Sequence, residues 1–126
     1  MRLPFALELL ALPKAVGEVR HMVQGDDVRL CVSELLTNVI RHVGEGTPVT
    51  VRVTSSHTGR LRVGVSDPDP RAWPILREAA AGAESGRGLA LVDAVALQWG
   101  VEPGPRGKTV WCELGAPVAP LAPAET

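Results

Sequence analysis

Apolar and polar positions alternate along some stretches of the chain and recur every three to four residues along others. Alternation places successive side chains on opposite faces of a strand, whereas apolar residues three and four apart share one face of a helix. The alternating stretches predict strands over 2–9, 49–54, 61–66, 98–102 and 109–114. The helical spacing predicts helices over 13–24, 27–43 and 89–97.

The longest periodic stretch is the helix predicted over 27–43. Its apolar residues recur at helical spacing and form one broad face: Val28, Cys31, Val32, Leu35, Leu36, Val39 and Val43. Glu34, Asn38 and Arg41 are four and three residues apart, so they stack on the opposite side. This helix therefore presents a core face and a polar face.

The ends of the same helix carry their own signals. Asp26 or Asp27 can cap its start, and both place negative charge at the positive end of the helix dipole. Gly44 and Gly46 follow its last turn and are expected to end it.

The order of the predicted elements favours an α+β fold. The residues between 55 and 59 form a turn, so the second and third strands make a hairpin with one face in water. Pro4 indicates that the first strand lies at a sheet edge. We expect a two-layer sandwich in which a mostly antiparallel, mixed sheet carries its helices on one face.

The chain of 126 residues suits one compact domain, expected over residues 1–115. The Ala-rich stretch over 71–85 lacks a clear pattern and is expected to be a loop with at most one helical turn. Residues 116–126 are rich in Ala and Pro and are expected to form a disordered tail.

Composition narrows the classes of function. The chain has 13 basic and 14 acidic side chains and 3% aromatic residues, which gives no support for nucleic-acid binding. Cys31 and Cys112 fall in apolar segments and are expected to be buried thiols, and no Cys/His spacing resembles a zinc site. The apolar segment 3–12 is too short to cross a bilayer, so we expect a cytoplasmic protein without a membrane partner.

Three features could carry chemistry, and each also has a purely structural interpretation. Glu34 and Asn38 place oxygen ligands side by side for Mg²⁺ or aim a base at a nucleophile, or they simply form a solvated helix face. Asp67 ends a strand, where it can accept a hydrogen bond from an adenine amino group or initiate an Asx turn. Gly86-Arg87-Gly88 opens a helix and can cradle a phosphate, or is a plain glycine-rich loop.

The order of these features resembles the GHKL ATPase superfamily, which has the Bergerat ATP-binding fold. The closest likeness is to the small anti-sigma-factor serine/threonine kinases of actinobacteria. It rests on the residues of three segments: Val32 to His42 (VSELLTNVIRH), Gly86 to Asp93 (GRGLALVD), and Gln98 to Leu114 (QWGV through GKTVWCEL). The resemblance covers about residues 3–115.

The resemblance implies roles for the helix and the adenine side of the site. Asn38 would coordinate the Mg²⁺ that bridges the ATP phosphates, and Glu34 would orient or deprotonate the acceptor hydroxyl. Asp67 would hold the adenine amino group, and Thr109 would support Asp67.

For the phosphate side, the resemblance implies that Gly86 and Gly88 let the lid and the helix start wrap the phosphates. Arg41 and Arg87 are added as phosphate contacts on the ground of charge alone. Phosphoryl transfer needs mainly positioning and neutralised charge, which these groups can supply.

The implied function is an ATP-dependent serine/threonine protein kinase. It would phosphorylate a STAS-type anti-anti-sigma protein and sequester a sigma factor, thereby regulating transcription. Homodimer formation is left open, because the helix over 13–24 is shorter than in the family.

One departure from the superfamily supports an alternative. The superfamily carries glycines directly after the aspartate, whereas this chain has Asp67-Pro68-Asp69-Pro70 and no glycine before Gly82. The adenine-side loop is therefore expected to be stiffer. The alternative is a non-catalytic regulatory module that keeps the fold, binds nucleotide weakly or not at all, and acts by capturing a partner.

Overall fold

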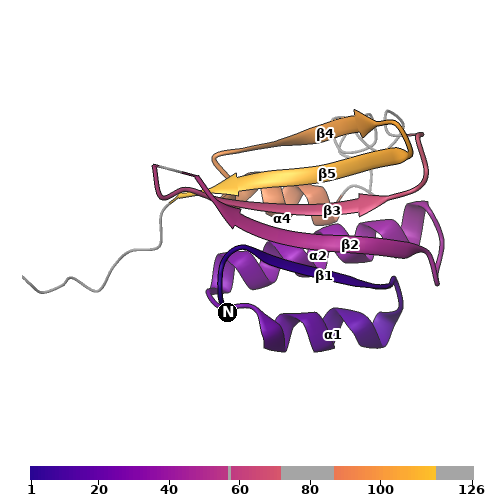
Figure 1. The fold of residues 1–126 in the computed structure, drawn as a ribbon, viewed down its shortest axis with the longest axis horizontal. Coiled ribbons are helices and arrows are strands. Elements are labelled where there is room, and N and C mark those ends of the chain that lie inside the picture. Colours follow the sequence, from indigo (N-terminus) through magenta and orange to yellow (C-terminus); the bar gives the residue numbers. More distant parts are fainter. Residues whose placement is uncertain (57, 72–86, 116–126) are drawn as a thin grey trace, which may run out of the picture.

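The computed structural model describes residues 1–56, 58–71 and 87–115, and for residues 87–89 it describes the backbone. In chain order the elements are β1 (Phe5–Leu10), α1 (Pro13–Met22), α2 (Asp26–His42), β2 (Pro48–Ser55), β3 (Leu61–Asp67), α4 (Arg87–Val95), β4 (Gln98–Gly104) and β5 (Gly107–Leu114). The strands form one sheet in the order β1-β2-β3-β5-β4, and the helices cover one of its faces (Figure 1). The predicted α+β sandwich is confirmed.

Every strand pairing among the described residues is antiparallel, whereas the sequence analysis predicted a mostly antiparallel, mixed sheet. β1 lies at one edge, as the proline before it predicted, and β2 and β3 form the predicted hairpin. Each predicted helix and strand is found, with ends that differ by a few residues at most.

The core lies between the sheet and α2. Alternate residues of β2, β3 and β5 point toward the helices and are buried: Val49, Val51, Val53, Leu61, Val63, Val65, Val110, Cys112 and Leu114. They pack against the apolar face of α2 that the sequence predicted. Burial of a valine or leucine side chain contributes roughly 1.5–3 kcal/mol, so this layer supplies most of the driving force for folding.

The ends of α2 correct one prediction. Gly25, with φ of 98°, is the N-cap residue, and no side chain caps the helix start. Asp26 and Asp27 lie inside the first turn, so they interact with the helix dipole but do not cap. After the helix, Gly44 and Gly46 have φ of 145° and 89°, values that favour glycine and end the helix as predicted.

Cys31 of α2 and Cys112 of β5 are both buried free thiols, as predicted. A hydrogen bond with Cys31, together with burial, raises the pKa of Cys112 well above its ordinary value. Cys112 therefore stays a neutral thiol and contributes to the core as a small apolar residue.

Several helices and strands begin or end at the same end of the sheet. α2 ends where β2 begins, and Thr50 of β2 pairs with Ser66 near the end of β3. α4 precedes β4, whose first residue Gln98 pairs with Glu113 at the far end of β5. The end of α2, the end of β3, the start of α4 and the β4–β5 turn therefore lie toward the same end of the molecule, on the right in Figure 1.

Within the described ranges, no helix has the length and apolar character needed to cross a membrane. The loop predicted over 71–85, apart from Arg71, and the tail predicted over 116–126 lie outside the described residues.

Candidate functional site

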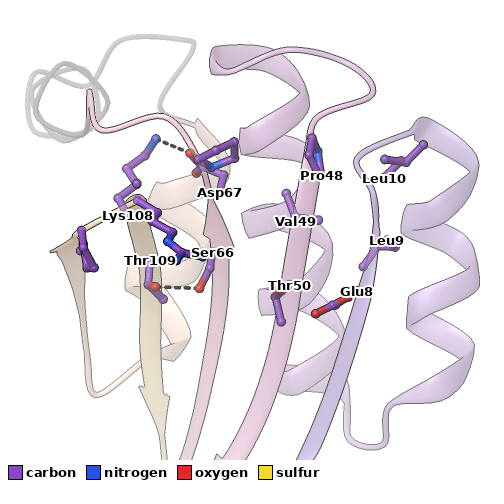
Figure 2. A pocket seen from close by; sticks show the side chains of 15 residues that line it. Glu8, Leu9, Leu10, Pro48, Val49, Thr50, Ser66, Asp67, Lys108 and Thr109 are labelled. Atoms are coloured by element: carbon purple, nitrogen blue, oxygen red, sulfur yellow. Dashed lines mark hydrogen bonds and ion pairs between the residues drawn. The ribbon is translucent and has the colours of Figure 1, made fainter.

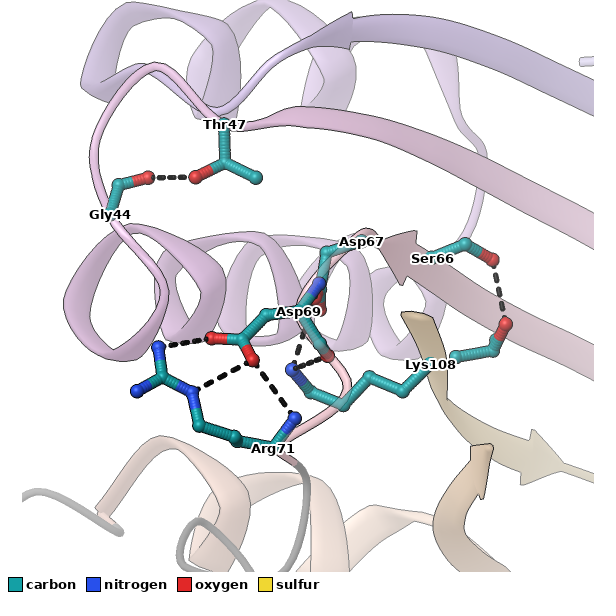
Figure 3. A network of polar contacts seen from close by, with 8 residues as sticks. Gly44, Thr47, Ser66, Asp67, Asp69, Arg71 and Lys108 are labelled. Carbon is teal, nitrogen blue, oxygen red and sulfur yellow. Dashed lines mark hydrogen bonds and ion pairs between the residues drawn. The ribbon is translucent and has the colours of Figure 1, made fainter. Parts of the chain in front are cut away.

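Asp67 ends β3 on the face of the sheet that the helices cover, because it continues the inward series of Val63 and Val65. The residue is 5% exposed. Its Oδ1 accepts a hydrogen bond from the Asp69 backbone N–H at 2.8 Å and another from the Lys108 ammonium at 3.0 Å (Figure 3). Its Oδ2 is buried and has no hydrogen-bond partner among the described residues. Such an unpaired buried acceptor costs about 1–3 kcal/mol, so its position indicates a place for a donor beyond the described residues.

The segment after β3 forms two successive Asx turns. The Asp69 N–H donates to Asp67, and the Arg71 N–H donates to Asp69 Oδ1 at 2.9 Å. The Arg71 guanidinium also donates to both oxygens of Asp69, and these hydrogen bonds lower the pKa of Asp69 to about 2. The turn interpretation of Asp67 is therefore confirmed. It uses one carboxylate oxygen only, so it is compatible with a ligand on the other.

Lys108 is a component of this site to which sequence reasoning gave no role. Its ammonium donates to Asp67 Oδ1 and to the Asp69 backbone carbonyl, each at 3.0 Å. In this ion pair the side chain of Lys108 is 1% exposed and that of Asp67 is 0% exposed. The signal was present in the alternation of β5, because a residue two before the buried Val110 must share its face.

Thr109 is placed differently from the prediction that it supports Asp67. It lies on the face of the sheet away from the helices, and its hydroxyl forms a 2.7 Å hydrogen bond with that of Ser66 (Figure 2). The reason is the pleat of the sheet. Asp67 pairs in register with Lys108, and Ser66 pairs with Thr109, so each pair points to its own face.

The polar residues of α2 are not equally exposed. Asn38 is buried at 6% exposure, one turn before the helix end and on the side of the sheet where Asp67 lies. Glu34 is half-buried one turn earlier, and Arg41 is exposed. The interpretation of these residues as a solvated helix face therefore fits Arg41 but not Asn38. A carboxamide that is buried within a helix cannot be hydrated, and Asn is disfavoured in helices.

The glycine-rich segment is described in part. Gly86 lies outside the described residues, and Arg87 and Gly88 are the first two residues of α4. The backbone places the start of α4 toward the end of the sheet that holds Asp67. Phosphate contacts by Gly86, Arg87 and Gly88 stay predictions.

A hollow of about 780 Å³ lies beside the ends of the strands (Figure 2). Its lining includes Glu8, Thr50 and Thr109 from the face away from the helices, and it borders Asp67 and Lys108. Glu34 and Asn38 do not line it. This hollow is therefore not the cleft expected between α2 and the glycine-rich segment, which falls partly outside the described residues.

The polar groups of Asp67 and Asn38 can be compared with those needed to bind the adenine and the magnesium ion of Mg-ATP. The buried, unpaired Oδ2 of Asp67 fits an exocyclic amine such as that of adenine. The carboxamide oxygen of Asn38 suits a hard cation such as Mg²⁺. The described residues contain no cluster of three His, Cys, Asp or Glu side chains that could hold a metal ion. A magnesium ion would therefore have Asn38 as a protein ligand and depend on phosphate oxygens and water for the rest.

Comparisons with known proteins agree with the fold. The chain is 51% identical over 100 residues to an uncharacterised protein of Streptomyces coelicolor, a match that covers 74% of this chain and 95% of the relative. The family profile of the histidine kinase-like ATPase domain matches residues 10–113, which span α2, Asp67 and most of β5. A match over this much of the chain, with the sheet and helices arranged as described, shows that the chain belongs to the histidine kinase-like ATPase domain family.

Proposed function

We propose that this protein is an ATP-dependent serine/threonine kinase and anti-sigma factor. It binds Mg-ATP, phosphorylates a STAS-type anti-anti-sigma protein, and sequesters a sigma factor when that protein is phosphorylated. The family supports nucleotide binding. The kinase activity and both partners rest on the resemblance of the α2 segment and of the segment after residue 85 to the anti-sigma-factor kinases.

The observation that carries nucleotide binding is the unpaired Oδ2 of Asp67. Oδ1 is already occupied by the turn and by Lys108, so the carboxylate presents a single acceptor. An ionised carboxylate accepts and never donates, so it favours a purine that carries an amino group over one that carries a carbonyl at the same position.

The α2 residues would act at the other end of the nucleotide. Asn38 would contribute its carboxamide oxygen to a magnesium ion, which when bound neutralises phosphate charge. Glu34 would accept the proton of the substrate hydroxyl while the hydroxyl oxygen attacks the γ-phosphorus of ATP. The bond between the γ-phosphorus and the bridging oxygen of ADP would break in the same step. Glu34 and Asn38 are four positions apart, so the base and the metal ligand stack on one side of one rigid helix.

Calorimetric titration of the full chain with ATP and Mg²⁺ tests the binding step. We expect saturable binding to the native protein and a loss of about tenfold or more with Asp67→Leu, since a hydrogen bond to a charged group is worth about 1.5–3 kcal/mol. Thr50→Val, on the face of the sheet away from the helices, is the control and should leave affinity unchanged. A native protein that does not bind would contradict the proposal.

Transfer to purified STAS-domain proteins with γ-labelled ATP tests the catalytic step. Glu34→Gln should bind ATP like the native protein but lose phosphoryl transfer, because an amide cannot take up the proton. Retained transfer in this variant would exclude Glu34 as the base.

The alternative, a module that captures its partner without catalysis, is favoured by one specific observation. The two Asx turns, with prolines at 68 and 70, replace the glycines that usually follow the aspartate and restrict the adenine-side loop. Under this alternative, Glu34→Gln would leave partner binding and sigma-factor sequestration unchanged, and the native protein would transfer no phosphate.

A further inference from the structure

The buried ion pair between Lys108 and Asp67 is not explained by stability alone. Lys108 interrupts the inward series of β5, in which the next members are Val110, Cys112 and Leu114. An apolar residue at this position would continue the core without the cost of removing an ammonium from water. Replacing a buried ion pair by apolar residues is often neutral or stabilising.

The backbone holds this pair in one arrangement. Asp67 and Lys108 are register partners at the end of the β3–β5 ladder. Gly107, with φ of 150°, lets the β4–β5 turn lie directly on the backbone of Asp67 and Pro68, where an added Cβ would come within 2.7 Å of the Pro68 Cα. The second contact of the Lys108 ammonium, to the Asp69 carbonyl, ties it to the turn as well.

The result is a carboxylate with one engaged oxygen and one free oxygen. Lys108 and the Asp69 N–H both donate to Oδ1, and the described residues provide no donor to Oδ2. The ammonium also compensates the negative charge of Asp67 in a site from which water is excluded.

We infer that Lys108 is a positioning residue for nucleotide selection: its hydrogen bond to Oδ1 holds the Asp67 carboxylate turned so that Oδ2 alone faces the base. The inference rests on the proposed function, and it adds that selectivity for a 6-aminopurine depends on a residue that does not touch the base. If Lys108 only stabilised the fold, its replacement would instead weaken the affinity for all purine nucleotides by the same factor.

The test compares ATP with purine riboside triphosphate, which lacks only the 6-amino group, in titrations of the full chain with Mg²⁺. The native protein should bind ATP about tenfold or more tightly than the analogue, the range expected for a hydrogen bond to a charged group. Lys108→Met should bring this ratio close to one. Asp67→Leu/Lys108→Met replaces the pair by apolar residues and gives the ratio expected when the carboxylate is absent.

The outcomes separate the two claims. A native protein that binds neither nucleotide overturns the proposed function and this inference with it. A selective native protein whose selectivity survives Lys108→Met, with both nucleotides weakened by the same factor, overturns the inference alone. If Lys108→Met does not fold, Lys108→Ala, which also removes the donor to Oδ1, replaces it, and an unchanged ratio again overturns the inference.

Discussion

Two neighbouring pairs of residues, where β3 ends beside the start of β5, face opposite environments. Asp67 and Lys108 form a buried ion pair under the helices, whereas Ser66 and Thr109 form a hydroxyl hydrogen bond on the other face. The pairs lie one residue apart on the same two strands and in the same register. Their comparison teaches that at a strand end the pleat, and not proximity in sequence, decides which side chain can reach a ligand site.

Breaking the buried pair should have the largest effect on stability. Lys108→Met leaves an unpaired carboxylate under the helices and should lower the free energy of unfolding by about 3–5 kcal/mol. Chemical denaturation monitored by circular dichroism measures this free energy of unfolding. Asp67→Leu/Lys108→Met is the matched variant and should recover most of the loss. If Lys108→Met lowered the free energy of unfolding no more than a typical surface substitution does, the pair would be solvated in solution.

The turn that brings Lys108 to Asp67 should be next in sensitivity. Gly107→Ala forces a residue with a Cβ into φ of 150° and against the Asp67–Pro68 backbone. A strained backbone conformation of this kind costs about 1–3 kcal/mol, and the steric contact adds to it. Gly104→Ala in the same turn is the control, since among the described residues its Cβ would meet only the Gly107 carbonyl oxygen at 4.0 Å. Equal midpoints of thermal unfolding for the two variants would contradict the prediction.

The pair on the other face should matter less and should not affect nucleotide binding. Thr109→Val removes the hydroxyl that contacts Ser66 and should cost about 0.5–1.5 kcal/mol. Its affinity for Mg-ATP should equal that of the native protein, because the side chain lies away from Asp67. A marked drop in ATP affinity would restore the supporting role that the family resemblance implied for Thr109.

The smallest effect should come from the ion pair between Asp69 and the exposed Arg71. The pKa of Asp69 is lowered from 3.8 to about 2 by Arg71, so its charged form is favoured in the folded state. The stability that this gives is present above about pH 4 and is lost as pH falls toward 2. The melting temperatures of the native protein and Arg71→Gln should therefore differ slightly at pH 5 and converge near pH 2. A difference that persists at pH 2 would point to a cause other than this ion pair.

The sequence predicted the fold well because hydrophobic periodicity and glycine positions are local signals. The apolar face of α2, the alternation of β2, β3 and β5, and the glycines after α2 are each visible in a short stretch. The helix start was less accurate. Aspartates near a helix start suit both the cap and the first turn, and only the backbone shows that Gly25 is the cap residue.

The candidate site was predicted in part. Asp67 lies at a strand end, and Asn38 lies on α2 toward the same end of the sheet. The role of Lys108 was missed because an inward lysine looks like a strand boundary in the sequence. It becomes part of the site only when a partner 41 residues earlier is brought alongside.

The sequence by itself determined which residues face the core, where the chain turns, and the family to which the order of motifs points, because these depend on patterns within short segments. Tertiary structure alone decided that Asp67 uses one oxygen for a turn and a lysine and leaves the other unpaired. It also decided that Thr109 belongs to the opposite face. The physical reason is that strand register and pleat join residues distant in sequence, and no local pattern encodes which of two adjacent residues meets which partner.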